Sequence, residues 1–133
     1  MQDGKLRYAY NYVGRNRYDV ESAEAVPTGR HQLRVEFEIT GNPDIAHGKG
    51  APGRGQLYID GTLVGQRDIE LTNPLAIGSL SAIVCGADPG APVTPHDKPP
   101  FPFTGTIYSV TVEVSGELIK DTAAEMRMAM ARQ

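Results

Sequence analysis

Apolar residues at every second position mark three stretches of this chain as strands. The stretches run from Leu6 to Tyr12, from Leu33 to Thr40 and from Thr104 to Val114. A period of two is typical of a β-strand with one face turned to a core. The buried face expected in the second stretch consists of Leu33, Val35, Phe37 and Ile39.

Shorter apolar segments and turn residues complete the pattern. Further strands are predicted over Arg17 to Ser22, Ile69 to Thr72 and Ile77 to Cys85, the last of them buried. Gly41 to Gly55 and Asp88 to Pro102 are rich in Gly and Pro, which favours long loops.

A hairpin is predicted where two apolar-alternating runs meet at Asp60-Gly61. A two-residue turn of type I′ needs positive φ at both central positions, which Gly accepts freely and Asp tolerates. The pair therefore sets the register of the two strands and indicates antiparallel β structure.

The end of the chain changes its period. Residues 120–132 are rich in Ala, Met, Glu and Arg, with Met126 and Met130 four positions apart, which predicts a short amphipathic terminal helix. About seven strands followed by this helix indicate two antiparallel sheets packed face to face. We expect residues 1–133 to form one mainly β sandwich domain.

Composition and charge exclude several classes of protein. The 133 residues carry a formal net charge of −3 and show no concentrated basic face, so we expect neither a nucleic-acid nor a membrane partner. Cys85 is the single cysteine, which rules out an intramolecular disulfide and favours a reducing compartment. The first residues show no export signal, so a cytoplasmic location is the simplest expectation.

No catalytic constellation is evident in the sequence. Cys85 ends a predicted buried strand without an adjacent base, which favours an inert packing role. The histidines His31, His47 and His96 lack the helical spacing or Cys partners of a zinc site, and His47 and His96 fall in the two long loops. These loop histidines are expected in solvent, although the two loops can bring them together at one end of a sandwich.

Loop carboxylates offer the one metal hypothesis. Asp44, Asp88 and Asp97 all lie in Gly- and Pro-rich loops, and Ca²⁺ accepts oxygen ligands of this kind. Their spacing matches no EF-hand loop, and Asp in a loop is more often a turn former. We therefore expect no cofactor and keep a structural calcium site as the alternative.

Two further groups of residues can form a ligand or partner surface. The loop from Gly48 to Gly55 holds Lys49 and Arg54 among four glycines, but no Lys-Ser/Thr and no helix follow it, as a phosphate loop requires. An anion or sugar contact by the two cations stays open. On the first strand Tyr8, Tyr10 and Tyr12 share one face, which a core, a partner domain or a sugar ring can use.

Five stretches resemble, in order and spacing, the C-terminal region of bacterial arylsulfatases. They are Lys5–Tyr12, Gly29–His31, Gly48–Gly50, Tyr58–Gly61 and Pro100–Ile107. The resemblance covers nearly the whole chain. It implies a concanavalin A-like, laminin-G-like jelly-roll sandwich that follows a catalytic domain, so we expect this chain to be a fragment of a larger sulfatase-like protein.

The resemblance brings no active site. The sulfatase signature has Cys or Ser, then Pro two residues later and Arg two residues after that, whereas Gly86, Ala87, Asp88 and Pro89 follow Cys85. We expect a non-catalytic accessory domain that packs on a sulfatase domain and shapes its cleft. The alternative is a lectin-like carbohydrate-binding module.

The resemblance also implies that a strand of the family is missing before Leu6. Its absence would leave the strand from Leu6 to Tyr12 with an unpaired, Tyr-rich edge, and such edges recruit partners. We expect a homodimer through this strand or through the terminal helix.

Overall fold

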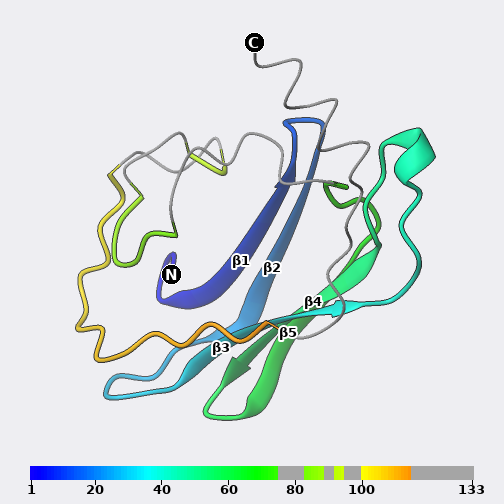
Figure 1. Ribbon diagram of the computed structural model, residues 1–133. Helices are drawn as coiled ribbons and strands as arrows, with labels where there is room; N and C mark the ends of the chain where they lie inside the picture. Colours follow the sequence, from blue (N-terminus) through cyan, green and yellow to red (C-terminus); the bar gives the residue numbers. More distant parts are fainter. Residues whose placement is uncertain (75–82, 89–91, 95–99, 115–133) are drawn as a thin grey trace.

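The computed structural model describes residues 1–74, 83–88, 92–94 and 100–114. Within them the chain forms two antiparallel sheets, β1–β2 and β3–β4–β5 (Figure 1). The expectation of a mainly β chain with two antiparallel sheets is therefore confirmed. The elements are β1 (Lys5–Tyr12), β2 (Asn16–Ala25), β3 (Leu33–Ile39), a short 3-10 turn η1 (Ile45–His47), β4 (Gly53–Ile59) and β5 (Thr62–Ile69).

The first sheet is a hairpin of β1 and β2. Tyr8 pairs with Val20 and Tyr10 with Tyr18 across the ladder. The register shifts near Leu6, where the buried Ser22 hydroxyl accepts a hydrogen bond of 3.1 Å from the Leu6 N–H. This side chain satisfies a donor that the irregular ladder would otherwise leave in the core.

The second sheet contains the hairpin predicted from the Asp-Gly pair. β4 and β5 join at Asp60 and Gly61, whose φ angles are 51° and 82°. Both are positive, as a type I′ turn requires, so this prediction is confirmed. β3 pairs with the other edge of β4 along its whole length, with Val35 opposite Leu57 and Phe37 opposite Gly55.

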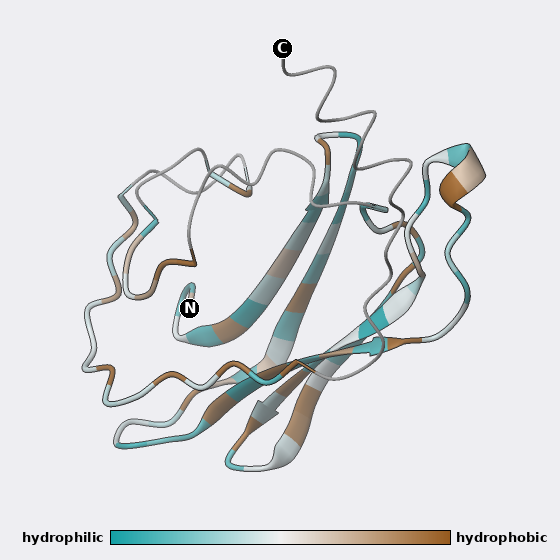
Figure 2. Cartoon of the chain, viewed as in Figure 1, coloured by the Kyte–Doolittle hydropathy of each residue, from teal (hydrophilic) through white to brown (hydrophobic). Residues whose placement is uncertain are grey.

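The core lies between the two sheets. Leu57 of β4 is fully buried and packs with Leu6 of β1 and Val20 of β2. Figure 2 shows apolar residues interspersed with polar ones along the strands, and the buried apolar residues of both sheets pack in one cluster. The contacts of β1 and β2 with the other sheet fall mainly on β4 and β5.

The face of β3 that was expected to be buried is open, so that expectation is wrong. Because β1 and β2 cover β4 and β5, they leave the same inward side of β3 without a cover. The side chains of this face are 38–60% exposed, from Leu33 at the low end to Ile39 at the high end. We call the face formed by Leu33, Val35, Phe37 and Ile39 the β3 apolar face.

The strand expected from Thr104 to Val114 is not formed. A strand needs hydrogen bonds to a neighbouring backbone, and no backbone bond joins this segment to β3 or to another strand among the residues that the structure places. Its apolar side chains are exposed, with Val114 at 95%. The strand predicted from the alternation is therefore wrong for this segment, because no neighbouring backbone pairs with it in the described part of the chain.

The buried strand expected from Ile77 to Cys85 is also contradicted where it can be compared. Residues 83–85 form no strand, and Cys85 is exposed rather than buried. The terminal helix predicted over 120–132, and the loop residues His96 and Asp97, lie outside the described residues. Within the described ranges no helix has the length and apolarity to cross a membrane.

Candidate functional site

The three tyrosines of β1 extend toward the second sheet, and two of them hold loops. The Tyr10 hydroxyl accepts a hydrogen bond of 2.7 Å from the Asn73 N–H, and the Tyr12 hydroxyl donates one of 2.9 Å to the Gly48 carbonyl. Tyr8 lies against Gly55, and burial raises the pKa of its phenol. Tyr10 therefore anchors the chain after β5, and Tyr12 anchors the loop after η1. Two of the three tyrosines on this face of β1 thus have a structural role.

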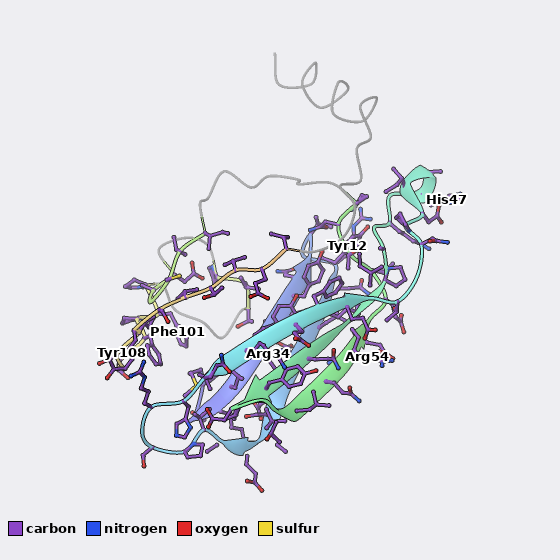
Figure 3. All side chains as sticks on the ribbon, turned by 60° about the horizontal axis from the view of Figure 1, so that its bottom comes forward. Tyr12, Arg34, His47, Arg54, Phe101 and Tyr108 are labelled. Carbon is purple, nitrogen blue, oxygen red and sulfur yellow. The ribbon has the colours of Figure 1, made fainter. Side chains whose placement is uncertain are left out.

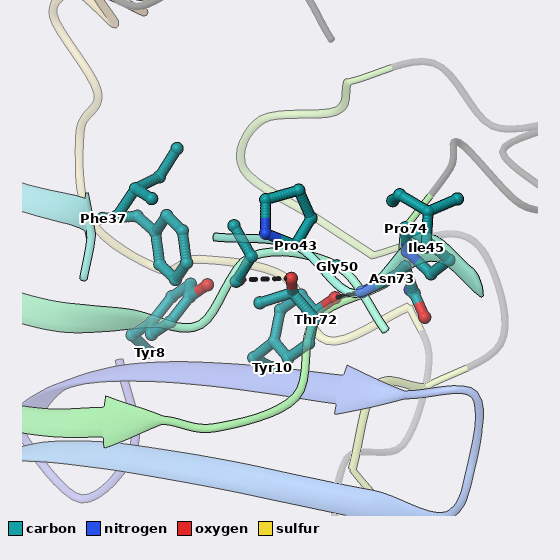
Figure 4. Close-up of a pocket in the computed structure, with 11 residues that line it drawn as sticks. Tyr8, Tyr10, Phe37, Pro43, Ile45, Gly50, Thr72, Asn73 and Pro74 are labelled. Carbon is teal, nitrogen blue, oxygen red and sulfur yellow. Dashed lines mark hydrogen bonds between the residues drawn. The ribbon is translucent and has the colours of Figure 1, made fainter. Parts of the chain in front are cut away.

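A pocket of about 310 Å³ opens beside Tyr8 and Tyr10 (Figure 4). Its wall is largely apolar, because Phe37 and Ile39 of the β3 apolar face contribute to it. No charged side chain lines it. The pocket therefore suits a small neutral ring better than an anion.

The polar wall of the pocket comes from the segment after β5, which the sequence did not indicate. The Thr72 hydroxyl donates a hydrogen bond of 2.6 Å to the Ala51 carbonyl. The Asn73 side-chain oxygen is buried and has no hydrogen-bond partner within the described part of the chain. The fold brings Asn73 to the tyrosines, since its N–H donates to the Tyr10 hydroxyl.

The loop candidates Asp44, His47 and Lys49 form a small closed turn around η1. The His47 ring nitrogen Nδ1 lies 2.8 Å from the Asp44 carboxylate, and this hydrogen bond lowers the pKa of Asp44. The Lys49 N–H donates a bond of 2.9 Å to the Asp44 carbonyl. Asp44 thus fixes its own loop, as expected of a turn former.

The calcium hypothesis gains nothing from the geometry. Across the described ranges, no three His, Cys, Asp or Glu side chains gather in a way that could hold a metal ion. Asp88 lies in another loop, where its N–H donates a bond of 3.0 Å to the Pro100 carbonyl.

Arg54 is already engaged on the outer face of the second sheet. It donates a bond of 2.7 Å to Asp68 on the adjacent strand, and this bond raises the pKa of the guanidinium. Figure 3 shows His47 at the tip of its loop and Arg54 on the sheet. Lys49 in the loop after η1 and Arg54 on β4 therefore lie in different environments.

A second feature that the sequence did not indicate is the link between β3 and the hairpin turn. His31 Nδ1 lies 2.6 Å from the Asp60 carboxylate, whose other oxygen accepts a bond of 2.8 Å from the Gln32 N–H. The hydrogen bond to Asp60 raises the pKa of His31, and the same bond lowers the pKa of Asp60. Asp60 therefore forms the turn and also fixes the start of β3.

A wide groove of about 1690 Å³ separates β3 from residues 103–113. Its lining includes Leu33, Val35 and Phe37 of the β3 apolar face. It also includes the charged residues Arg34, Glu36 and Glu38 of the same strand. Near its end the Arg30 guanidinium lies 4.6 Å from the centre of the Tyr108 ring, a cation–π contact that ties the two sides together. Figure 3 shows Tyr108 and Phe101 on a segment separate from β3, which carries Arg34.

Comparison with known proteins gives no match: no family model, no curated protein and no solved structure is similar to this chain.

Proposed function

We propose that this chain is a non-catalytic accessory domain of an arylsulfatase-like sulfuric ester hydrolase, where it packs on a catalytic domain and shapes its cleft. The observation that carries the proposal is the open β3 apolar face, together with the groove above it. An exposed apolar face formed by four neighbouring side chains of one strand is typical of a contact with another protein or domain. Burying the exposed half of each side chain contributes roughly 1 kcal/mol, half of the value for full burial.

The identity of the partner is supported by the residue pattern shared with arylsulfatase C-terminal regions. The finer fold that we propose on the same basis is a concanavalin A-like jelly roll. The observed pair of antiparallel sheets supports this fold. We expect the chain to complete the jelly roll when it is part of the parent protein.

An antibody raised against this chain tests the proposal. We expect it to detect a native polypeptide much larger than the 14.3 kDa of these residues. We also expect immunodepletion to remove hydrolysis of an aryl sulfate from the cell extract, while a non-immune antibody leaves it. A native polypeptide of 14.3 kDa, or aryl sulfatase activity that survives depletion, would refute the proposal. Hydrolysis of the aryl sulfate by the purified chain alone would also refute it.

The pocket beside Tyr8 favours a second candidate function, a lectin-like carbohydrate-binding module. Its wall of Tyr8 and Phe37 offers rings on which a neutral sugar can stack, as in jelly-roll lectins. Titration with neutral monosaccharides, followed by the ring signals of Tyr8 in NMR, tests this function. Saturable shifts that Phe37→Ala abolishes support it, and unchanged spectra refute it.

A further inference from the structure

Two hairpin turns of this chain share the sequence Asp-Gly. They are Asp3-Gly4, which precedes β1, and Asp60-Gly61, which joins β4 to β5. The sequence contains no other Asp-Gly pair and no Asn-Gly pair. The φ angles are 50° and 78° in the first turn and 51° and 82° in the second. The two turns are therefore matched in both sequence and backbone conformation.

An Asp-Gly pair carries all the groups needed for a spontaneous rearrangement of its backbone. The glycine nitrogen attacks the carbon of the aspartate side-chain carboxyl group. A C–N bond forms, the C–OH bond of the carboxyl group breaks, and the hydroxyl leaves as water with the proton of the amide. Water then opens the imide ring at either of its carbonyls, which gives aspartate or isoaspartate. Glycine favours the attack because it has no Cβ beside the nitrogen.

The carboxylate of Asp60 is held by two neighbours. One oxygen lies 2.6 Å from His31 Nδ1, and the other accepts a hydrogen bond of 2.8 Å from the Gln32 N–H. Ring closure expels one of these two oxygens as water, so it costs at least one of the two contacts. The ring also closes from the carboxylic acid, whereas the contact with His31 lowers the pKa of Asp60 and keeps the group ionised.

The carboxylate of Asp3 has no such contact. Its side chain is exposed and makes no hydrogen bond or ion pair within the described part of the chain. Exposure does not separate the two aspartates, because the Asp60 side chain is itself 52% exposed. The glycine nitrogens do not separate them either, since neither Gly4 nor Gly61 donates its N–H to a described residue. The difference between the turns therefore lies in the hold on the carboxylate.

The turns also differ in what closes them. The Asp60 turn joins β4 and β5, which pair along their length. The Asp3 turn is closed by a single isolated bridge, in which Gln2 and Lys5 exchange bonds of 3.1 and 2.9 Å. A short bridge opens more readily than a long ladder, so the backbone of Asp3 has more freedom to reach the geometry of the ring.

We propose that Asp3 is a site of spontaneous isoaspartate formation in the folded protein, and that His31 and Gln32 protect Asp60 from the same reaction. In the product the main chain runs through the Cβ of residue 3, which adds one atom to the turn and leaves a free carboxylate on the surface. The added atom separates Gln2 from its bonds to Lys5. The inference does not depend on the accessory role, because it uses no contact with another domain.

Incubation of the full 133-residue chain in heavy-oxygen water, at neutral pH and physiological temperature, tests the inference. Opening of the ring takes one oxygen from water, so each aspartate that has reacted carries the heavy isotope. Trypsin separates the two sites, because it cleaves after Lys5, Arg54 and Arg67. Electron-transfer fragmentation in the mass spectrometer then distinguishes isoaspartate from aspartate. We expect label and isoaspartate to accumulate at Asp3 at least about tenfold faster than at Asp60, the factor for one hydrogen bond to a charged group.

Three controls assign the difference to the contacts of Asp60. His31→Ala removes one contact and should raise the rate at Asp60 about tenfold while the rate at Asp3 stays the same. Asp3→Glu lengthens the side chain, so ring closure is disfavoured and label at position 3 should fall to background. In guanidinium chloride the wild-type chain loses both turns, and the two sites should react at similar rates. This last comparison needs no variant to fold.

Four results would overturn the inference. They are equal labelling of Asp3 and Asp60 in the folded chain, the absence of label at Asp3, and a rate at Asp60 that a folded His31→Ala protein leaves unchanged. The fourth is a preference for Asp3 that persists in guanidinium chloride, because the cause would then be the local sequence and not the fold.

Discussion

The contact between the two sheets at Gly65 can be tested with a single methyl group. Gly65 of β5 lies against β2, where an added Cβ would stand 2.6 Å from the Glu21 carbonyl oxygen. Ordinary contact begins near 3.4 Å, so Gly65→Ala requires the strands to separate by about 0.8 Å, the difference between the two values. The obstacle is backbone, which cannot rotate aside as a side chain can.

The size of the effect follows from two opposing terms. Overpacking of a tight contact costs about 1–3 kcal/mol. Replacing Gly by Ala in a strand recovers roughly 0.5–1 kcal/mol of chain entropy. The net loss is therefore about 1–2 kcal/mol, which for a domain of this length lowers Tm by about 4–7 °C at about 2.1 cal/mol/K per residue.

Urea unfolding and a thermal scan, both followed by circular dichroism, measure this loss. Gly55→Ala is the matched control, because its Cβ would meet the Tyr8 ring at 3.2 Å and the Ile69 side chain at 3.4 Å, and side chains can move. We expect its cost to be smaller than that of Gly65→Ala. If Gly65→Ala unfolds at the urea concentration of the wild type, or if Gly55→Ala costs more, the sheets do not meet as described.

Three further substitutions probe the site. The NMR titration of His31 should give a pKa above the ordinary value of about 6.5, and Asp60→Asn should return it to that value. Because the folded pKa is raised, the stabilisation from protonated His31 is complete below the unfolded pKa and is lost as the pH rises through the folded one. Tyr10→Phe removes the acceptor of the half-buried Asn73 N–H and should cost about 1–2 kcal/mol in urea unfolding. Arg54→Ala breaks an exposed ion pair and should leave the urea midpoint unchanged.

Each of these three predictions has a result that would contradict it. A His31 titration that Asp60→Asn does not alter would place the source of the shift elsewhere. Full stability of the Tyr10→Phe protein would mean that solvent or another group serves the Asn73 N–H. A marked loss on Arg54→Ala would show that the outer face of the second sheet carries more of the stability than its exposure indicates.

The parts of the fold that were predicted correctly from sequence are local. Asp60-Gly61 sets the positive φ angles of its turn by itself, so the turn between β4 and β5 could be placed from the sequence. The alternation from Leu33 to Ile39 likewise located β3. In both cases the information lies in residues that are neighbours in the chain.

The parts that failed depend on distant partners. The pocket needs Asn73 to meet Tyr10, which is 63 positions away, and no pattern within either segment indicates this. The pairing of Asp60 with His31 was missed for the same reason, since Asp60 was interpreted only as a turn former. The exposure of Cys85 was missed because the apolar and β-branched residues before it were taken to indicate a buried strand.

Two stretches, β3 and residues 104–114, alternate apolar and polar residues as half-buried strands do, but their apolar side chains are exposed. They lie on opposite sides of one groove. Phe37 on β3 and Ile107 across from it both line the groove, and both are more than 40% exposed. Alternation over seven or more residues is typical of strands buried on one face, and keeping such a face in water carries a cost in free energy and an aggregation hazard.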